Sequence, residues 1–159
     1  MIPWLRLFLF AFVALHVGRA DASPTLVPTY VAPAISGNSD DTKLAHFALE
    51  SWQRASNKSL QFAPSPENLA LLRIYWVDAW HPGGFGEMRE IVVNGQPGAA
   101  LYVNVATELL GEEIDAQARA DRLYRDTIVY LTCVHELGHG LGLVHTADYL
   151  DIMYSFQFG

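Results

Sequence analysis

One short segment constrains the fold of this chain more than any other. The run H-E-L-G-H from His135 to His139 places two histidines four residues apart, and a third follows at His145. Four helical residues turn through about 400°, so the imidazoles of His135 and His139 project from one helical face and can reach one ion. The segment therefore predicts a helix that ends at a metal site.

The residues after the helix complete such a site. Gly142 stands where the helix must stop and turn, which needs a residue free to adopt φ > 0. His145 can then return as a third nitrogen ligand and leave one position of a tetrahedral Zn²⁺ open for water, as in catalytic zinc sites. Glu136 is the candidate general base for that water. A plain helix with surface histidines and a glycine cap is the alternative, but it explains neither Glu136 nor His145.

This set of residues resembles the signature of the metzincin metallopeptidases. Their pattern H-E-x-x-H-x-x-G-x-x-H is matched in full by His135, Glu136, His139, Gly142 and His145. The resemblance implies one catalytic zinc ion, peptide-bond hydrolysis and a protein or peptide substrate.

A second motif is similar to the methionine turn that metzincins carry beneath the metal. The segment D-I-M-Y at 151–154 places Met153 eight residues after His145, which is similar to the matrixin branch. Other branches have a zinc-binding tyrosine two positions after the methionine, where this chain has Ser155, so Tyr154 is not expected to be a ligand. The resemblance implies that Met153 supports the site without binding the metal.

The resemblance also implies an α+β fold, with a twisted mixed sheet, a first helix, an active-site helix and a short C-terminal part that holds the methionine turn. Helical spacing of apolar residues predicts the two helices at 40–57 and at about 122–140. Four side chains of the first helix are expected to pack on the sheet: Leu44, Phe47, Ala48 and Trp52.

Strand signals lie between the two helices. The run at 69–77 is rich in β-branched and aromatic residues and predicts a central strand, and 60–62 is a shorter candidate. Segments 90–93 and 99–103 flank an Asn-Gly turn signal, and one of them is expected to be the substrate-binding edge. The Pro-rich segment 23–36 is expected to form an extended arm, or an edge strand at most. The acidic segment 107–120 has mixed character and predicts no clear element.

The first 22 residues resemble a secretory signal peptide. One positive charge precedes eleven largely apolar residues, and small residues follow at Ala20 and Ala22. Eleven helical residues rise about 16 Å, far less than the roughly 30 Å of a bilayer core, so stable membrane insertion is not expected. The prediction is a leader at 1–22, one domain at 23–159, and a secreted or periplasmic protein.

Composition excludes several classes. The formal net charge of −7 argues against a nucleic-acid-binding surface, which needs clustered Lys and Arg. The single cysteine, Cys133, cannot form an intramolecular disulfide, and its place on the helix predicts packing in the core. The chain is expected to be a monomer.

Other candidate ligands have simpler interpretations. His46 is expected to be a partly exposed helical residue, and His81 alone makes a second zinc ion doubtful. Trp76 and Trp80 are expected to be core and rim aromatics. Four acidic residues could chelate Ca²⁺, but they do not match an EF-hand loop and fit a solvated acidic face better: Glu112, Glu113, Asp115 and Asp121. The sequence thus predicts a secreted zinc endopeptidase; the alternative is a zinc-stabilised binding module without turnover.

Overall fold

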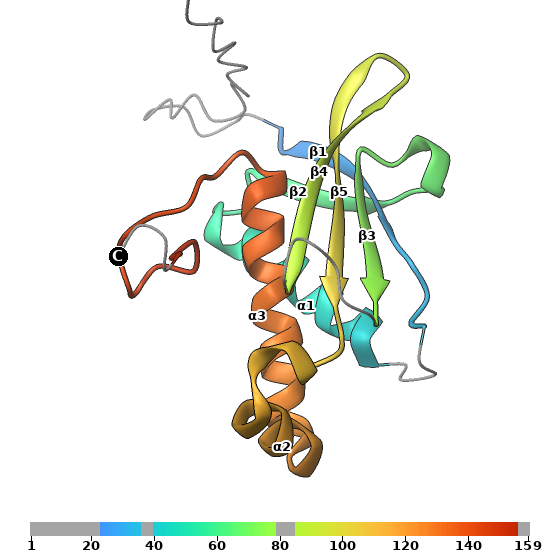
Figure 1. Cartoon of the computed structure of the whole chain (residues 1–159). Coiled ribbons are helices and arrows are strands. Elements are labelled where there is room, and N and C mark those ends of the chain that lie inside the picture. The colour runs from blue at the N-terminus through green and yellow to red at the C-terminus, as the bar shows by residue number, and fades with distance from the viewer. Residues whose placement is uncertain (1–22, 36–39, 79–84, 156–159) are drawn as a thin grey trace, which may run out of the picture.

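A five-stranded mixed sheet with two helices packed on one face forms the centre of the molecule (Figure 1). The computed structural model describes residues 23–35, 40–78 and 85–155. The elements follow one another in this order: β1 (Thr25–Val31), α1 (Asp40–Ala55), β2 (Leu60–Pro64), a 3₁₀ turn η1 (Glu67–Leu69), β3 (Leu72–Val77), β4 (Gly86–Val93), β5 (Gln96–Asn104), a 3₁₀ turn η2 (Glu108–Leu110), α2 (Glu112–Ala120) and α3 (Arg122–Gly140).

The strand order is β2-β1-β3-β5-β4, with only β4 antiparallel to its neighbour. The predicted α+β fold is confirmed, including a helix between the first two strands. β3 lies at the centre as predicted, although it begins at Leu72 because the turn η1 takes up Glu67–Leu69.

The N-terminal segment contradicts the expectation of an arm or edge strand. β1 lies inside the sheet, parallel to β2 on one side and to β3 on the other. Pro28 is tolerated there because pairing with β3 begins only at Thr29, while the Pro28 carbonyl still accepts a hydrogen bond from the Leu71 amide (2.9 Å). The missing amide of Pro28 therefore falls at the beginning of a ladder and interrupts no run of hydrogen bonds.

The hairpin of β4 and β5 is longer than the two predicted segments. Its turn is formed by Asn94 and Gly95, as predicted, and their φ angles of 52° and 80° are those of a type I′ turn. This turn pairs Val93 with Gln96, and pairing continues to Gly86 opposite Val103. β4 is the strand at the sheet edge, beside β5.

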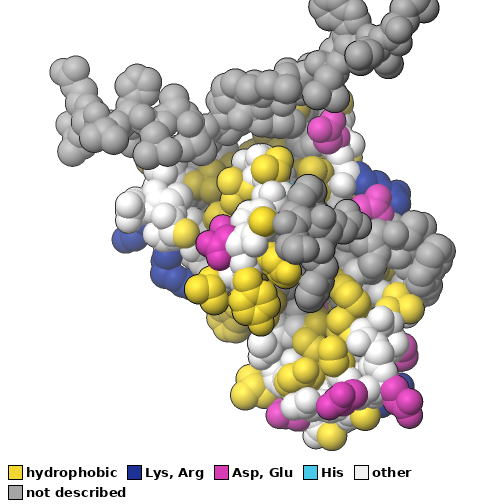
Figure 2. Space-filling model, turned by 60° about the vertical axis from the view of Figure 1, so that its left-hand side comes forward, with side chains coloured by type: hydrophobic (Ala, Val, Ile, Leu, Met, Phe, Trp, Pro, Cys, Tyr) yellow, Lys and Arg dark blue, Asp and Glu magenta, His cyan; other side chains and the backbone are white. Residues whose placement is uncertain are grey.

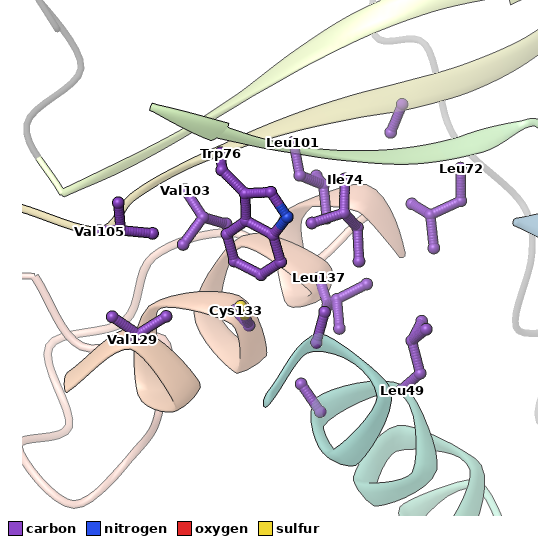
Figure 3. Close-up of a cluster of buried hydrophobic side chains, with 13 residues drawn as sticks. Leu49, Leu72, Ile74, Trp76, Leu101, Val103, Val105, Val129, Cys133 and Leu137 are labelled. Carbon is purple, nitrogen blue, oxygen red and sulfur yellow. The ribbon is translucent and has the colours of Figure 1, made fainter. Parts of the chain in front are cut away.

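The core lies between the sheet and the helices α1 and α3 (Figure 3). Cys133 is buried in it, as predicted, beside strand residues such as Ile74 and Leu101. Ala48 of α1 is also buried, but the prediction for Phe47 is wrong: this side chain is 53% exposed. The helix turns Ala45, Ala48 and Leu49 toward the core, and Phe47 projects away from that side.

Helix α2 was not predicted, because its sequence is acidic and has few apolar residues. Asp115 is buried and accepts a hydrogen bond from the Thr107 hydroxyl (2.7 Å). It also pairs with Arg119, and the Thr107 hydrogen bond, followed by Arg119, lowers the pKa of the Asp115 carboxyl. Asp121 caps α3 by accepting from the backbone amides of Leu123 and Tyr124. Two of the four acidic Ca²⁺ candidates therefore have partners within the protein.

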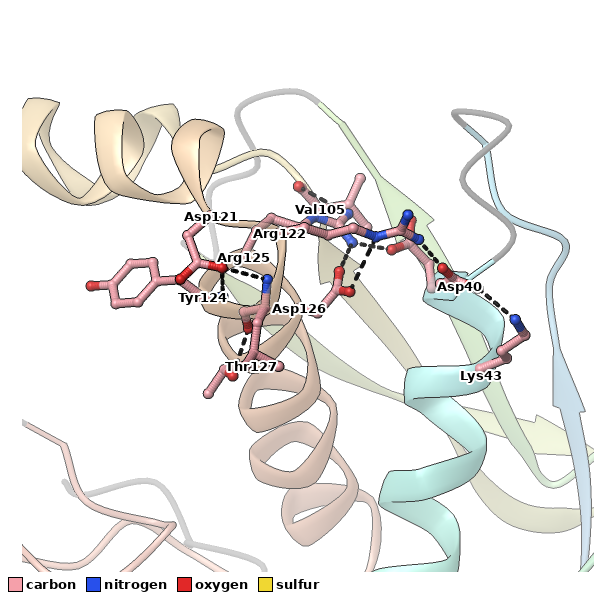
Figure 4. Close-up of polar contacts among 11 residues, drawn as sticks. Asp40, Lys43, Val105, Asp121, Arg122, Tyr124, Arg125, Asp126 and Thr127 are labelled. Atoms are coloured by element: carbon pink, nitrogen blue, oxygen red, sulfur yellow. Dashed lines mark hydrogen bonds and ion pairs between the residues drawn. The ribbon is translucent and has the colours of Figure 1, made fainter.

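Charged side chains join the first turns of α1 and α3 (Figure 4). Arg122 pairs with Asp40, and Arg125 pairs with Asp41 and Asp126. Asp41 is fully buried, and Arg125 also donates to the carbonyl of Val105 (3.4 Å). These contacts set the two helices side by side at the end opposite the histidines. Among the described residues, no helix has the length and apolarity needed to span a membrane.

Candidate metal centre

The C-terminal end of α3 positions two of the three histidines. His135 and His139 lie one turn apart, and the helix ends just after Gly140. The amide of Leu143 donates to the carbonyl of Gly138, and that of Gly142 donates to His139 (both 2.9 Å), which is a Schellman motif. Gly142 adopts a φ of 91°, a conformation that disfavours residues with a side chain.

The loop that follows turns the imidazoles toward one point. His135 Nδ1 donates to the carbonyl of Ile152 (2.7 Å), and His139 Nδ1 donates to that of Leu143 (2.9 Å). Because a carbonyl only accepts, both rings carry their proton on Nδ1 and present the lone pair of Nε2. His145 Nε2 lies 3.2 Å from Nε2 of His135 and 3.1 Å from that of His139.

This donor set fits a zinc ion. A tetrahedral ion with Zn–N bonds of about 2.0–2.1 Å holds its nitrogen ligands about 3.3 Å apart, close to both distances from His145. One proton on His145 could not serve two lone pairs in two linear hydrogen bonds, so a cation satisfies the three nitrogens better. Backbone carbonyls behind ligating histidines are also typical of metal sites. Among the described residues, His135, His139 and His145 are the group able to hold a metal ion.

Burial lowers the pKa of two of these histidines and so favours the neutral form that binds metal. It lowers the pKa of His135, and the nearby His139 acts in the same direction, although the hydrogen bond to Ile152 opposes both. Burial also lowers the pKa of His145, followed in effect by the other two histidines. Neutral imidazoles are thus favoured at this end of α3 before any ion binds.

Met153 lies beneath the histidines. It is buried, and its sulfur packs so closely on Gly138 that a Cβ there would overlap it. The amide of Thr146 donates to the Met153 carbonyl (2.9 Å), and that of Ser155 donates to the Thr146 carbonyl (3.2 Å). These bonds hold the segment that carries His145 against the segment that carries Met153.

The side chain of Glu136 lies beside the beginning of β4. Its side chain is 6% exposed and lies against Gly86, where a Cβ would come 2.6 Å from the carboxylate carbon. Burial, and secondly the charge of Glu87, raises the pKa of Glu136 to about 7. A carboxyl group with this pKa can both take up and release a proton near neutral pH.

The remaining candidates lie elsewhere. His46 is exposed on α1, as expected, and Trp76 is buried with its indole N–H donating to the Ala32 carbonyl (2.8 Å). Tyr154 packs its ring against Tyr149, with the centroids 5.5 Å apart. The expectations for 79–84, which include His81 and Trp80, lie outside the described residues.

Apolar side chains are exposed on the loop that carries His145. Figure 2 shows such side chains gathered on the face where α3 and the C-terminal segment come forward. The exposed ones on this loop are Leu143, Val144, Tyr149 and Leu150. The metal centre therefore lies beside a largely apolar surface.

Two parts of the site could not be predicted from the sequence. The carbonyls of Leu143 and Ile152 orient the imidazoles. Every residue has a backbone carbonyl, so the sequence does not indicate which carbonyls take this role. Gly86 follows two other glycines in the sequence, at 83–84, and nothing near it in the chain indicates that it faces Glu136, about fifty residues further on.

Comparison with known proteins agrees with this geometry. A search of curated proteins found no match. The matrixin family model matches residues 29–158, which include the whole sheet from Thr29 onward, the three histidines, Glu136 and Met153. Since the match covers most of the chain, this protein belongs to the matrixin family, a family of zinc metallopeptidases.

Proposed function

We propose that this protein is a secreted zinc-dependent endopeptidase. The observation that carries the proposal is the convergence of three imidazole nitrogens at the end of α3, the helix that also carries the buried carboxyl of Glu136. The signal-peptide pattern at 1–22 supports secretion.

In the proposed mechanism, His135, His139 and His145 hold the zinc ion. When bound, zinc lowers the pKa of a water molecule and polarises the carbonyl of the scissile bond. Glu136 takes the proton of the attacking water and returns it to the leaving amine.

We propose that the backbone of the substrate binds along the outer edge of β4. Asn104 donates its amide to the Phe85 carbonyl (2.8 Å), so the pairing of alternate residues turns the peptide groups of Gly86, Met88 and Glu90 away from β5. An extended peptide can pair with these groups and pass beside Glu136. Protein or peptide is accordingly the proposed substrate class.

The test compares the purified wild type with Glu136→Gln and with Glu113→Gln, which changes an exposed residue of α2. We expect wild type and Glu113→Gln to cleave casein in a chelator-sensitive way. Glu136→Gln should lose about 10²–10⁴-fold in kcat, the usual contribution of a general base, and keep one zinc ion per chain. Unchanged activity of Glu136→Gln would refute the role of Glu136.

The test also separates the alternative function. If the wild type binds zinc stoichiometrically and cleaves neither casein nor a peptide library, the protein is a zinc-stabilised binding module. Zinc content, measured by elemental analysis, decides between this outcome and a failure of metal loading.

A further inference from the structure

Gly86, the first residue of the edge strand β4, lies directly against the side chain of Glu136. A Cβ at this position would come 2.5 Å from Cγ and 2.6 Å from Cδ of Glu136, and would also overlap Oε1. Real Cβ atoms essentially never come this close to atoms of another residue. Gly86 therefore provides the space in which this side chain lies.

The backbone of Gly86 does not itself require glycine. The glycines with positive φ among the described residues are Gly95, Gly111 and Gly142. Gly86 pairs with Val103 in regular antiparallel register, in a conformation open to any residue. Space for Glu136, and not backbone strain, is what excludes a side chain here.

Among the described residues, Glu136 is oriented by packing. The side chain is 6% exposed, and no hydrogen bond or ion pair to its carboxylate occurs among the described residues. Asp41 and Asp115, also buried, are instead held by Arg125 and by Thr107 with Arg119. Since none of the described residues offers Glu136 a polar partner, the direction of its carboxylate depends on the surfaces packed beside it, Gly86 among them.

We propose that Gly86 is a positioning residue for Glu136. The bare Cα of the edge strand lets the carboxylate lie against the strand whose outward peptide groups would pair with a substrate. A single residue then fixes the distance between the base and the bound peptide. This inference rests on the proposed peptidase function and adds the residue that places the base.

The kinetic test is Gly86→Ala, with Gly98→Ala as the matched control. Gly98 lies on the neighbouring strand, where a Cβ would overlap the backbone carbonyl of Leu71, so the substitution disturbs the same sheet away from Glu136. In Gly86→Ala we expect kcat to fall about 100-fold, the order of loss for a displacement of about 1 Å. KM and zinc content should stay within about twofold of wild type. Gly98→Ala should keep kcat per zinc-loaded molecule.

A second measurement does not depend on activity. In excess chelator, Gly86→Ala should lower Tm by about 2–12 °C, the shift expected for overpacking in a chain of this size. In the Glu136→Ala background the same change should lower Tm by less than half as much, because the overlap is gone. If Gly86→Ala does not fold, the double variant Gly86→Ala/Glu136→Ala takes its place, and its folding supports the contact.

These results are decisive in either direction. An equal fall of Tm in both backgrounds, an unfolded double variant, or an equal loss of kcat in Gly86→Ala and Gly98→Ala would overturn the role of Gly86. If the wild type proves inactive, the proposed function fails, while the Tm comparison still decides whether Gly86 places Glu136.

Discussion

Replacing Arg125 by methionine tests the buried ion pair that joins α1 to α3. The side chain of Asp41 is completely buried, and Arg125 is the cation paired with it among the described residues. One carboxylate oxygen of Asp41 accepts from Arg125, and the other has no hydrogen-bond partner within 23–35, 40–78 and 85–155. Arg125→Met therefore leaves a charge inside the protein without compensation.

The expected cost follows from this burial. Breaking a buried pair by removing one partner costs about 3–5 kcal/mol. At about 2–4 °C per kcal/mol for a chain of this size, Tm should fall by about 6–20 °C. Lys43→Met is the control: Lys43 pairs with Asp40, but its side chain is 66% exposed. Such a surface pair contributes about 0–1 kcal/mol.

Urea unfolding followed by circular dichroism, in excess chelator to exclude effects of metal binding, measures both variants. The double variant Asp41→Leu/Arg125→Met should recover most of the loss, because it removes the isolated charge and fills the site with apolar atoms. A loss in Arg125→Met no larger than in Lys43→Met would refute the reasoning. So would a double variant as unstable as the single one.

Three further predictions concern the site and its helix. Burial raises the pKa of the Cys133 thiol, so a thiol reagent should react with it only at urea concentrations that unfold the protein; reaction in native buffer would contradict its burial. The lowered pKa values of His135 and His145 mean that the folded protein binds fewer protons there than the unfolded chain. Both the zinc affinity and the stability of the apo-protein should therefore be constant near neutral pH and fall as the pH drops through about 6.5 and below. A chelator competition from pH 8 to pH 5 measures the zinc affinity. A fall of this affinity between pH 8 and pH 7 would be inconsistent with the lowered pKa values. Gly138→Ala should destabilise the protein by about 1–3 kcal/mol through overlap with the Met153 sulfur. In a Met153→Ala background, thermal unfolding should show that the same substitution costs less than half as much, because the overlap with the sulfur is gone.

The parts of the structure that could be predicted are those encoded locally. The helix at 122–140 was predicted with its correct bounds, because its apolar spacing and the glycine turn that ends it lie within one segment. The convergence of the three histidines follows from helical spacing and one turn at Gly142. The Asn-Gly turn is equally local, since its two residues determine the type of turn they form.

The predictions that were wrong or absent concern features that depend on contacts between residues far apart in the sequence. Pro28 argues for an edge strand, and only the point at which β3 joins the sheet makes an interior position acceptable. Phe47 fits the apolar pattern of its helix, yet the smaller Ala45 and Ala48 face the core. In α2, the buried Asp115 accepts a hydrogen bond from Thr107 and pairs with Arg119. A hydrophobic pattern does not indicate such polar contacts, so it could not predict this helix.

The site depends both on local sequence and on contacts between distant segments, so metal binding and the placement of Glu136 can be lost separately. The histidines lie within eleven residues, so metal binding needs little beyond the end of α3. The position of Glu136 against Gly86 depends instead on the register of β4 with β5, which begins at the turn of Asn94 and Gly95. A shift of one residue in β4 would present Phe85 or Glu87 to α3 in place of Gly86. Phe85 would fill the space that Glu136 occupies, and Glu87 would add a second carboxylate beside it. A register error in the hairpin should therefore abolish the proposed catalysis and leave the three metal ligands intact.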